Sequence, residues 1–526
     1  MGVNNKGVLD GYDGVELALE ILSFSGGENT ISEDQVMKAN EAEQCENWDA
    51  ISLGGMERAK GFAQRGTGGA SYSAQSDLLA HHKDTGGTVL YGVIAGDLVK
   101  LVGSTITQDD AGAFTSGTLC HSVSTENDGL WITNATDNLK KKAVGVAIAT
   151  PASQPTTACA RIYRHKNRLV AEGSGSVPKR IYGTRTGTVN WTAADAWSLS
   201  NDAWSIDLPN DTRGCVPNFP SGNEILAFTE DSAYALSNFP NTAYRPIGTP
   251  SRGCSAPYSI ALGDEGVYFL SKKPTLGVFL FDGVNFVELT QFNRDVFVED
   301  IDFSKRIFGV YRNKRYYIFY NELNSGVSYP NKCRMYDARF GRWMARPINS
   351  ALSDNLGYPA ILLYSSSNEL YCASSRSDLW YELESGDSDA GQNTEATYKT
   401  KTFSSRDFSY ASGGQFGIDD VKLKLTSMVV TYYGTTGSVP VLWNADRGLH
   451  TGTKTIDLTA SGDLINSTFI VNSSSVTSSP QDRTRMYPFP NGAVGRRFDF
   501  TISNSGTSTR PRIKKIKVNA IALDEM

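Results

Sequence analysis

The chain has 526 residues, more than a single hydrophobic core usually supports, so two or three domains are expected. Lys and Arg number 50 against 56 Asp and Glu. The formal net charge of −6 argues against a protein whose main role is to grip nucleic acid, because that binding needs a basic face. A hydrophobic fraction of 40% is ordinary for a globular protein, and 50 glycines are typical of many short strands and tight turns.

Cysteine usage and apolar runs point to a protein made in a cytoplasm. The seven cysteines are an odd number, widely scattered, and form no C-x-x-C pair, so we expect reduced thiols that mostly fill the core. The opening MGVNNKGVLDGYDG contains no apolar stretch of a secretion signal. No run approaches the roughly 18 apolar residues of a membrane helix, so no membrane segment is expected.

Residues 1–62 carry the helical signals. The apolar run over 15–22 predicts a short helix, and Ser32 with Gln35 forms a capping-box pattern that opens a second, polar helix over SEDQVMKANEAEQCENW. We therefore predict an N-terminal arm with short helices.

Residues 63–400 are dominated by short strands and turns. Two apolar strands flank a polar turn at 223–236, 258–270, 306–320 and 359–373, and a third strand follows several of these pairs. The pairs recur every ~35–55 residues, close to the length of one four-stranded propeller blade. The pattern predicts a β-propeller of about six to eight blades.

The third strands share an aromatic residue and a turn. The segment CRMYDARFGRWMA (333–345) could be a lone hairpin, a sugar-binding box or one copy of a repeat, and its relatives at 278–289 and 378–386 favour the repeat. In this structural blade motif we expect aromatic side chains to fill the wedge between blades, an Asp to cap the turn and a Gly to supply the turn conformation. The predicted motif residues are Tyr336, Asp337, Gly341, Trp343, Asp282, Gly283 and Trp380.

Residues 401–526 read as a separate antiparallel β-sandwich that follows a polar, linker-like stretch. Near its end, Ile516, Val518 and Ala520 alternate with polar residues, as expected for a sheet with one buried face. The predicted fold class is all-β: a propeller with a short N-terminal helical segment and a C-terminal antiparallel sandwich.

Enzymatic signals are weak. His81 and His82 are adjacent, so we expect them to point apart and to lie at the surface or in turns. Cys120 and His121 are sequence neighbours, whereas a catalytic pair normally comes from separate elements. No G-x-S-x-G, P-loop or EF-hand pattern occurs. We expect no catalytic residue, no cofactor and no metal site. The carboxylates around Asp300 and Asp302 leave a propeller glycosidase as a minor alternative.

Three stretches together resemble the tail nozzle, or head-stabilisation, family of short-tailed bacteriophages. The middle one, residues 160–202, contains a His-x-Asn-Arg-Leu strand that begins at His165, and the last runs from GAVGRRFDF to the terminal strand. The first, residues 24–62, carries the N-terminal family motif at Gly26, Gly27, Asn29, Thr30, Asn40, Glu41, Ala42, Asn47, Gly54 or Gly55, Arg58 and Gly61.

The resemblance implies a structural virion protein that is assembled in the host cytoplasm and is not an enzyme. Six copies would form a ring or tube below the portal and adaptor, extend the DNA channel and dock fibres or spikes. DNA would pass through the lumen without sequence-specific binding. A monomeric propeller that binds a protein or a glycan is the alternative, and a glycosidase is a further one.

Overall fold

The computed structural model describes residues 14–523 apart from several internal segments. Those left undescribed are 31–36, 52–53, 69–71, 73, 85–86, 126–127, 156, 188–195, 200–201, 249–250, 292–297, 348–356, 365–366, 376–377, 434–437, 459–481, 491 and 507–509. The chain divides into two compact units. The sandwich unit comprises Met1–Gly61, Phe340–Asn349 and Ser385–Met526, and the propeller unit comprises Phe62–Arg339 and Ser350–Glu384.

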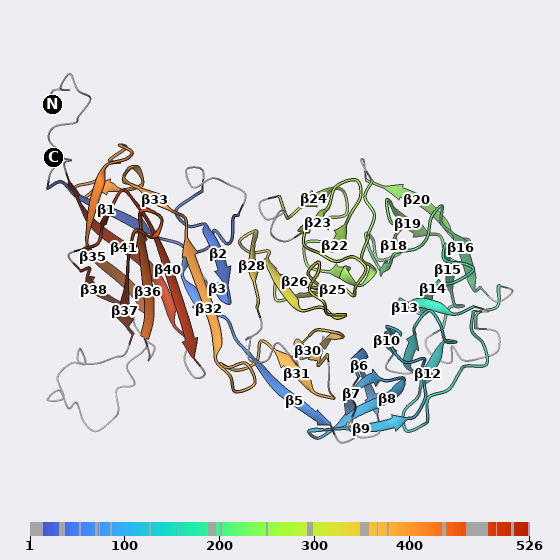
Figure 1. Cartoon of the computed structure of the whole chain (residues 1–526). Coiled ribbons are helices and arrows are strands. Elements are labelled where there is room, and N and C mark those ends of the chain that lie inside the picture. Colours follow the sequence, from blue (N-terminus) through green and yellow to red (C-terminus); the bar gives the residue numbers. More distant parts are fainter. Residues whose placement is uncertain are drawn as a thin grey trace, which may run out of the picture. The chain divides into compact units, whose positions relative to one another are not determined.

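The propeller unit contains seven antiparallel strand groups among its described residues, and these groups follow one another around a ring (Figure 1). We number them in chain order. Sheet 1 is β6(Ser76–Asp84), β7(Gly87–Ile94), β8(Asp97–Val102) and β9(Thr105–Asp110); sheet 2 is β10(His121–Thr125), β11(Gly129–Thr133) and β12(Lys140–Lys142). Sheet 3 is β13(Cys159–His165), β14(Arg168–Gly173), β15(Arg180–Gly183) and β16(Trp204–Asp207).

Sheet 4 is β17(Cys215–Pro217), β18(Ile225–Phe228), β19(Ala233–Ser237) and β20(Ala243–Ile247); sheet 5 is β21(Ala261–Leu262), β22(Val267–Ser271), β23(Gly277–Phe281) and β24(Phe286–Glu288). Sheet 6 is β25(Phe308–Arg312), β26(Arg315–Tyr320) and β27(Lys332–Asp337); sheet 7 is β29(Ile361–Tyr364), β30(Glu369–Ala373), β31(Trp380–Leu383) and β5(Phe62–Gly68).

Strand β5 completes the propeller with residues from early in the chain. It pairs antiparallel with β31, where Phe62 lies opposite Leu383, and its far end pairs in parallel with β9 at Thr67 and Thr105. A strand that is shared in this way leaves no open sheet edge where the ring closes.

The sandwich unit has two sheets. The first contains β1(Glu16–Ile21), β3(Trp48–Ala50), β4(Met56–Arg58), β34(Ser409–Tyr410), β35(Lys422–Tyr433), β38(Asp482–Pro488), β39(Val494–Gly495) and β41(Arg512–Leu523). The second contains β28(Arg342–Ala345), β2(Ala42–Glu46), β32(Thr394–Thr400), β33(Phe403–Ser404), β40(Arg497–Gly506), β36(Ser438–Ala445) and β37(His450–Asp457). Side chains such as Val430, Trp443, Phe500 and Val518 are buried in this unit.

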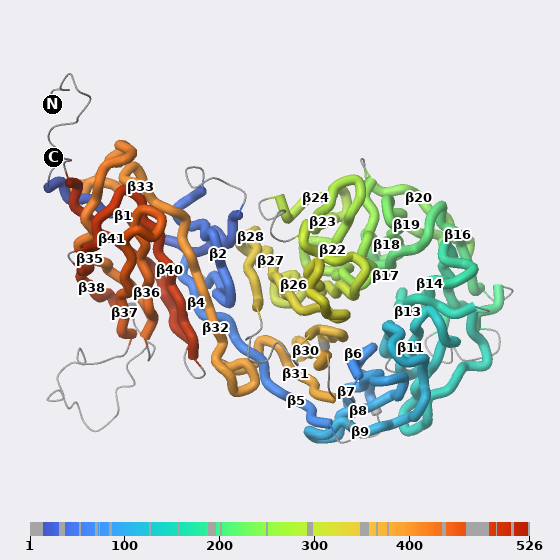
Figure 2. Tube along the Cα trace, in the orientation of Figure 1, coloured from blue at the N-terminus to red at the C-terminus, as the bar shows by residue number. Residues whose placement is uncertain are grey.

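The predicted all-β fold with a propeller is confirmed, but the helix expected over 15–22 is wrong. Those residues form β1, which pairs antiparallel with β41 from Glu16–Ile521 to Ile21–Ile516 (Figure 2). Glu16 and Glu20 are exposed and four residues apart, a spacing that occurs on one face of a helix and also on one face of a strand. The segment forms a strand because it pairs with a distant strand, which outweighs its local preference for a helix.

The second predicted helix fails where it is described, because residues 42–46 form β2; its start, with Ser32 and Gln35, lies outside the described residues. The unit boundaries also differ from the predicted 1–62, 63–400 and 401–526. Residues 1–61, 340–349 and 385–400 belong with the C-terminal strands. No helix in the described part of the chain has the length and apolarity that crossing a bilayer needs.

Candidate functional site

The inner strands of the propeller surround a cavity of about 380 Å³. All seven sheets contribute to its lining, through β6, β10, β13, β17, β21 and the segment before it, β25 and β29. The apolar lining side chains include Leu78, Leu79, Ile260, Leu262, Val310 and Leu362. Around them lie the rings of His121, Tyr163, Tyr258, Phe308 and Tyr311. The walls therefore combine apolar side chains with polar groups.

Close approach of two inner segments requires a glycine in the cavity wall. A Cβ at Gly309 would lie 2.0 Å from the Ser259 carbonyl oxygen, so no larger residue fits there. The Tyr316 hydroxyl donates to the same carbonyl at 2.8 Å. These contacts hold β25 against the segment before β21 and shape this side of the cavity.

His121 joins two neighbouring inner strands at the cavity wall. Its Nδ1 accepts the N–H of Ile162 on β13, and its ring lies 5.0 Å from Tyr163. Burial, reinforced by Arg161, lowers the pKa of His121 to about 4, so the imidazole is neutral at pH 7. The thiol of Cys120 donates instead to the Thr118 carbonyl at 3.4 Å, and burial raises its pKa. The two neighbours thus make separate contacts.

A buried ion pair supports the same wall. Arg161 on β13 donates through Nε to Glu172 on β14 at 3.1 Å, and its guanidinium lies 5.9 Å from the Tyr258 ring. Burial alone would raise the pKa of Glu172, but the arginine lowers it overall, so both groups are charged. The pair is mutually satisfied and stabilises the wall.

A second ion pair borders the cavity. Arg306 contacts Asp77 at 2.5 Å and donates to the carbonyls of Ser76 and Pro359, each at 3.1 Å. Asp77 also accepts the Gly117 N–H at 3.0 Å. Arg306 therefore ties sheets 1 and 7 together, and the cavity wall gains no net charge from this pair.

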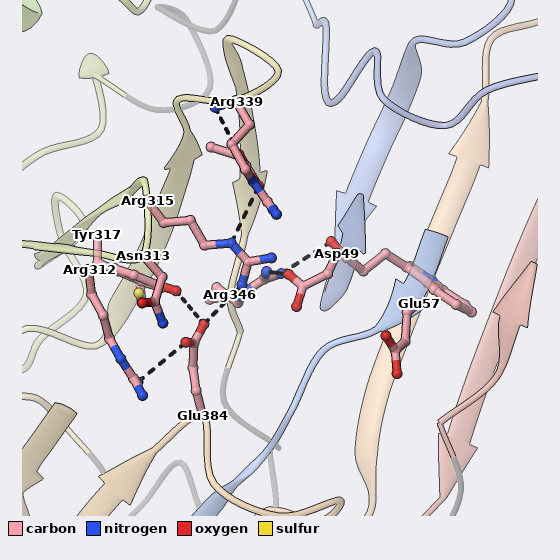
Figure 3. A network of polar contacts seen from close by, with 12 residues as sticks. Asp49, Glu57, Arg312, Asn313, Arg315, Tyr317, Arg339, Arg346 and Glu384 are labelled. Atoms are coloured by element: carbon pink, nitrogen blue, oxygen red, sulfur yellow. Dashed lines mark hydrogen bonds and ion pairs between the residues drawn. The ribbon is translucent and has the colours of Figure 1, made fainter. Parts of the chain in front are cut away.

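A polar network lies where sheets 6 and 7 meet (Figure 3). Glu384 accepts the Tyr317 hydroxyl and lies 3.4 Å from Arg312 and 3.6 Å from Arg315. Arg315 also reaches Asp337 at 3.3 Å. Burial, with Glu384 close by, raises the pKa of Tyr317, so its hydroxyl stays protonated. Because each carboxylate faces an arginine, we interpret the network as a clasp between the two sheets.

The turn residues named in the blade motif make contacts within their own turns. Asp337 is fully buried and accepts the Arg339 N–H at 3.1 Å, while Gly341 has φ of 66°. Asp282 accepts two backbone N–H groups, those of Val284 and Asn285, both at 2.7 Å, and Gly283 has φ of 103°. Both turns need the left-handed backbone that glycine adopts without strain.

The aromatic motif residues lie in different surroundings. The Tyr336 ring is 6.3 Å from Tyr268 of sheet 5. Trp380 is completely buried and packs with Leu79 and Ile106 of sheet 1. Trp343 is also buried, but it lies in β28 of the sandwich unit, where its carbonyl accepts the Glu28 N–H at 3.1 Å. The motif residues therefore form no single site.

Other candidate residues have structural contacts. His81 and His82 lie on β6. His82 was predicted to lie at the surface or in a turn, but it is only 1% exposed and contacts Ser124 at 3.0 Å. Asp302 accepts the Ser304 N–H at 2.9 Å and so caps its own turn. Among the described residues, no three His, Cys, Asp or Glu side chains gather as a metal site would need.

The N-terminal family motif forms buried joints in the sandwich unit. Arg58 is fully buried and donates to the carbonyls of Asp387 at 2.9 Å and Thr394 at 3.2 Å. Asn47 donates to the carbonyls of Pro347 at 3.0 Å and Glu395 at 2.7 Å.

Two motif glycines sit in equally tight places. At Gly26 a Cβ would lie 2.1 Å from the Asn40 carbonyl oxygen, and at Gly61 it would lie 2.1 Å from that of Ser388. The motif is thus explained by close packing.

The residues that line the cavity, in contrast, could not be recognised in the sequence, because they come from segments spread over 77–363.

No protein-family model matches the chain, and no curated protein matches it significantly. Among solved structures it is similar to BamB from Moraxella catarrhalis, with 11% identity and a TM-score of 0.37 over 64% of this chain and 93% of that one. The extracellular domain of BT4673 from B. thetaiotaomicron gives 11% identity and a TM-score of 0.41, with 64% of this chain covered. The match spans only 41% of that domain. The Pan2 WD40 domain of Neurospora crassa gives 6% identity and a TM-score of 0.35, covering 59% of this chain and 89% of that one.

Proposed function

We propose that the chain is a non-enzymatic binding module whose propeller cavity receives an apolar segment of a protein partner. The observation that carries this proposal is the cavity of about 380 Å³, whose lining includes leucine, isoleucine and valine side chains. Its volume falls in the range of roughly 300–1,000 Å³ that is usual for ligand sites. Leu262 at the cavity wall is 51% exposed and so offers apolar surface to a ligand.

The polar groups of the wall favour a protein segment over a glycan. A sugar site needs free hydrogen-bonding groups beside its aromatic rings, but the Tyr311 hydroxyl is bonded to Glu265 at 2.6 Å. The Tyr163 hydroxyl accepts the Cys215 N–H at 3.2 Å. Asp77 and Arg306 neutralise one another. These polar groups of the wall are thus already paired with other groups of the chain, while the leucine and valine side chains beside them offer apolar contacts.

A selection of random peptides on the immobilised full chain tests the proposal. Val310→Arg and Leu362→Arg place a charge in the cavity, and each should weaken binding of the selected peptides at least tenfold. Val284→Arg is the matched control, because Val284 is 73% exposed on the turn between β23 and β24. Peptides that bind all three variants equally, or a selection that yields no apolar peptide, would contradict the proposal. Thermal unfolding of each variant checks that it is folded.

A phage tail nozzle subunit is the second candidate function, and the sequence resemblance supports it. The residues that carry the resemblance near the N-terminus, such as Asn47, Arg58 and Gly61, make buried packing contacts in the sandwich unit of this chain. In this role, six copies would form a ring below the portal and adaptor and dock fibres or spikes.

Native mass spectrometry and electron microscopy test the nozzle role. The 57.1 kDa chain is measured alone and with a reconstituted portal and adaptor complex. A ring of about six copies on that complex is expected. A strict monomer under both conditions at high concentration would contradict the nozzle role and would leave the cavity proposal intact.

A further inference from the structure

The first sheet of the sandwich unit has an outward face that is rich in cations. Alternate residues of β35 and β41 are buried, which places the residues between them on the outer face. Of the side chains that the structure describes there, six are cationic and four, on β1, β3 and β4, are carboxylates. They are Lys422, Lys424, Arg512, Lys514, Lys515 and Lys517, against Glu16, Glu20, Asp49 and Glu57.

Part of this positive charge is balanced within the sheet. Glu20 lies 3.2 Å from Lys515 and 3.4 Å from Lys517, and Glu57 lies 2.9 Å from Arg512. Lys422 and Lys424 have no ion pair among the described residues. Further along β35, Met486 of β38 lies opposite Val429 and is 66% exposed. We call this surface the basic face.

The second sheet has an outward face of the opposite sign. Its described outer side chains on β2, β32, β36, β37 and β40 include five carboxylates and two cations. They are Glu43, Glu46, Glu395, Asp457 and Asp499, against Lys399 and Arg497. Lys399 pairs with Glu43 at 2.5 Å, whereas Glu46 and Glu395 have no ion pair in the described part of the chain. We call this surface the acidic face.

The acidic face also carries several short side chains. Three exposed threonines of β37, Thr451, Thr453 and Thr455, lie beside the partly exposed Leu442 of β36. Short side chains lose little conformational entropy when they are covered, so such a face suits docking against another sheet. One face thus carries an excess of two positive charges and the other an excess of three negative charges, so the two faces are of opposite sign.

We propose that the basic face of one copy of this chain binds the acidic face of the next copy, head to tail. The proposal rests on the assembly role described above, and it adds the surfaces by which copies meet. Two different patches on each copy make a heterologous contact, the kind that builds rings and tubes. Strands β35 and β41 are each 12 residues long, so the basic face is ~40 Å long, and at four strands ~4.8 Å apart it measures ~800 Å². That is the area which each partner buries in a stable interface.

Charge reversal on one face at a time tests the proposal. Lys422→Glu with Lys424→Glu makes both faces of a copy negative, and Glu46→Lys with Glu395→Lys makes both positive. Each of these variants should associate with itself at least tenfold more weakly than the unaltered chain. An equimolar mixture of the two should assemble again, because every contact in the mixture joins unlike charges. Sedimentation velocity and native mass spectrometry measure the association, which should also weaken as salt is raised.

Control variants distinguish a wrong assignment of the two faces from a failure of the assembly role itself. Lys305→Glu, an exposed site in the propeller unit, should leave assembly unchanged. If the unaltered chain assembles and the face variants assemble equally well, the faces are wrongly assigned while the assembly role stands. If the unaltered chain remains monomeric at every concentration, with or without adaptor and portal, both proposals fail. A variant pair that loses assembly and is not restored in the mixture points to a different partner for these faces, and overturns the proposal.

Discussion

The imidazole Nδ1 of His121 accepts the backbone N–H of Ile162 at 3.3 Å, which joins the inner strands of sheets 2 and 3. His165 repeats the arrangement between sheets 3 and 4, where its Nδ1 accepts the Asn218 N–H at 3.3 Å. An acceptor nitrogen must be unprotonated, so both contacts require neutral histidine. The inner ring of the propeller is thus held in part by two groups that titrate.

Acidification should therefore destabilise the propeller. Burial lowers the pKa of His121 and His165 from 6.5 to about 4, so the folded state prefers the neutral form. Their contribution is complete above pH 6.5 and is lost as the pH falls toward 4. Each histidine can account for up to about 3 kcal/mol of unfolding free energy over that range. Urea unfolding at pH 7 and pH 4.5 measures the loss.

A glutamine at position 121 separates titration from hydrogen bonding. Its amide oxygen can accept the Ile162 N–H but does not titrate, so His121→Gln should lose less stability on acidification than the unaltered chain. His450→Gln is the control, because His450 is exposed on β37. If both variants show the full loss, other groups cause the acid sensitivity.

The wedge between sheets 1 and 7 depends on Trp380. Its side chain is completely buried against Leu79, Ile94 and Ile106, so Trp380→Ala should leave a cavity and lower the unfolding free energy by about 3–5 kcal/mol. Tyr244→Ala, at a side chain that is 42% exposed, should cost less than about 1 kcal/mol. Calorimetry compares the melting temperatures of the two variants. Equal melting temperatures would show that the Trp380 indole does not lie in the core.

The sequence predicted the propeller well because its signals are local. Each strand pair, such as residues 258–270, shows its two apolar runs and its turn within a short window. Asp282 and Gly283 likewise act within one turn. These features depend on few distant contacts, so they could be recognised without any structure.

The sandwich unit and the cavity could not be predicted in the same way. Strand β1 pairs with β41, about 500 residues further along, and its Glu16–Glu20 spacing fits two kinds of element. Trp343 lies in a short segment that returns to the sandwich unit, although its sequence resembles a propeller strand. The cavity exists only where seven inner strands meet, and leucines such as Leu78 and Leu362 look like any core residue in sequence.

Arg58 should tolerate no substitution, including lysine. Its guanidinium donates to the carbonyls of Asp387, Thr394 and Gly506, a planar multidentate arrangement that an ammonium group cannot reproduce. Arg58→Lys would leave buried carbonyls without a donor, at an expected cost of about 3 kcal/mol. Arg497→Lys, on the exposed start of β40, should be nearly neutral. Urea unfolding of both variants provides the comparison, and equal stabilities would show that the buried contacts contribute little.

Gly61 is required by space rather than by backbone conformation. A Cβ at this position would lie 2.1 Å from the Ser388 carbonyl oxygen, so Gly61→Ala must displace one of the two segments. We expect a loss of about 2–4 kcal/mol, since rearranging a packed joint costs as much as overpacking a core. Gly222→Ala is the matched control, because nothing lies within 4 Å of its Cβ position. Comparable melting temperatures for the two variants would mean that the joint is loose.

The clasp at Glu384 should be sensitive to charge rather than to shape. Glu384→Gln keeps an oxygen for the Tyr317 hydroxyl, but it removes the attraction to Arg312 and Arg315, whose side chains are 12% and 14% exposed. Arg312 would then lose its ion pair with Glu384, whereas Arg315 would keep its contact with Asp337 at 3.3 Å. We expect a loss of about 2–3 kcal/mol, whereas Glu322→Gln should change little, because its pair with Lys332 is 43% and 47% exposed. Hydrogen exchange of β26 and β31 locates the effect: faster exchange there in Glu384→Gln supports a clasp between sheets 6 and 7, and unchanged exchange would refute it.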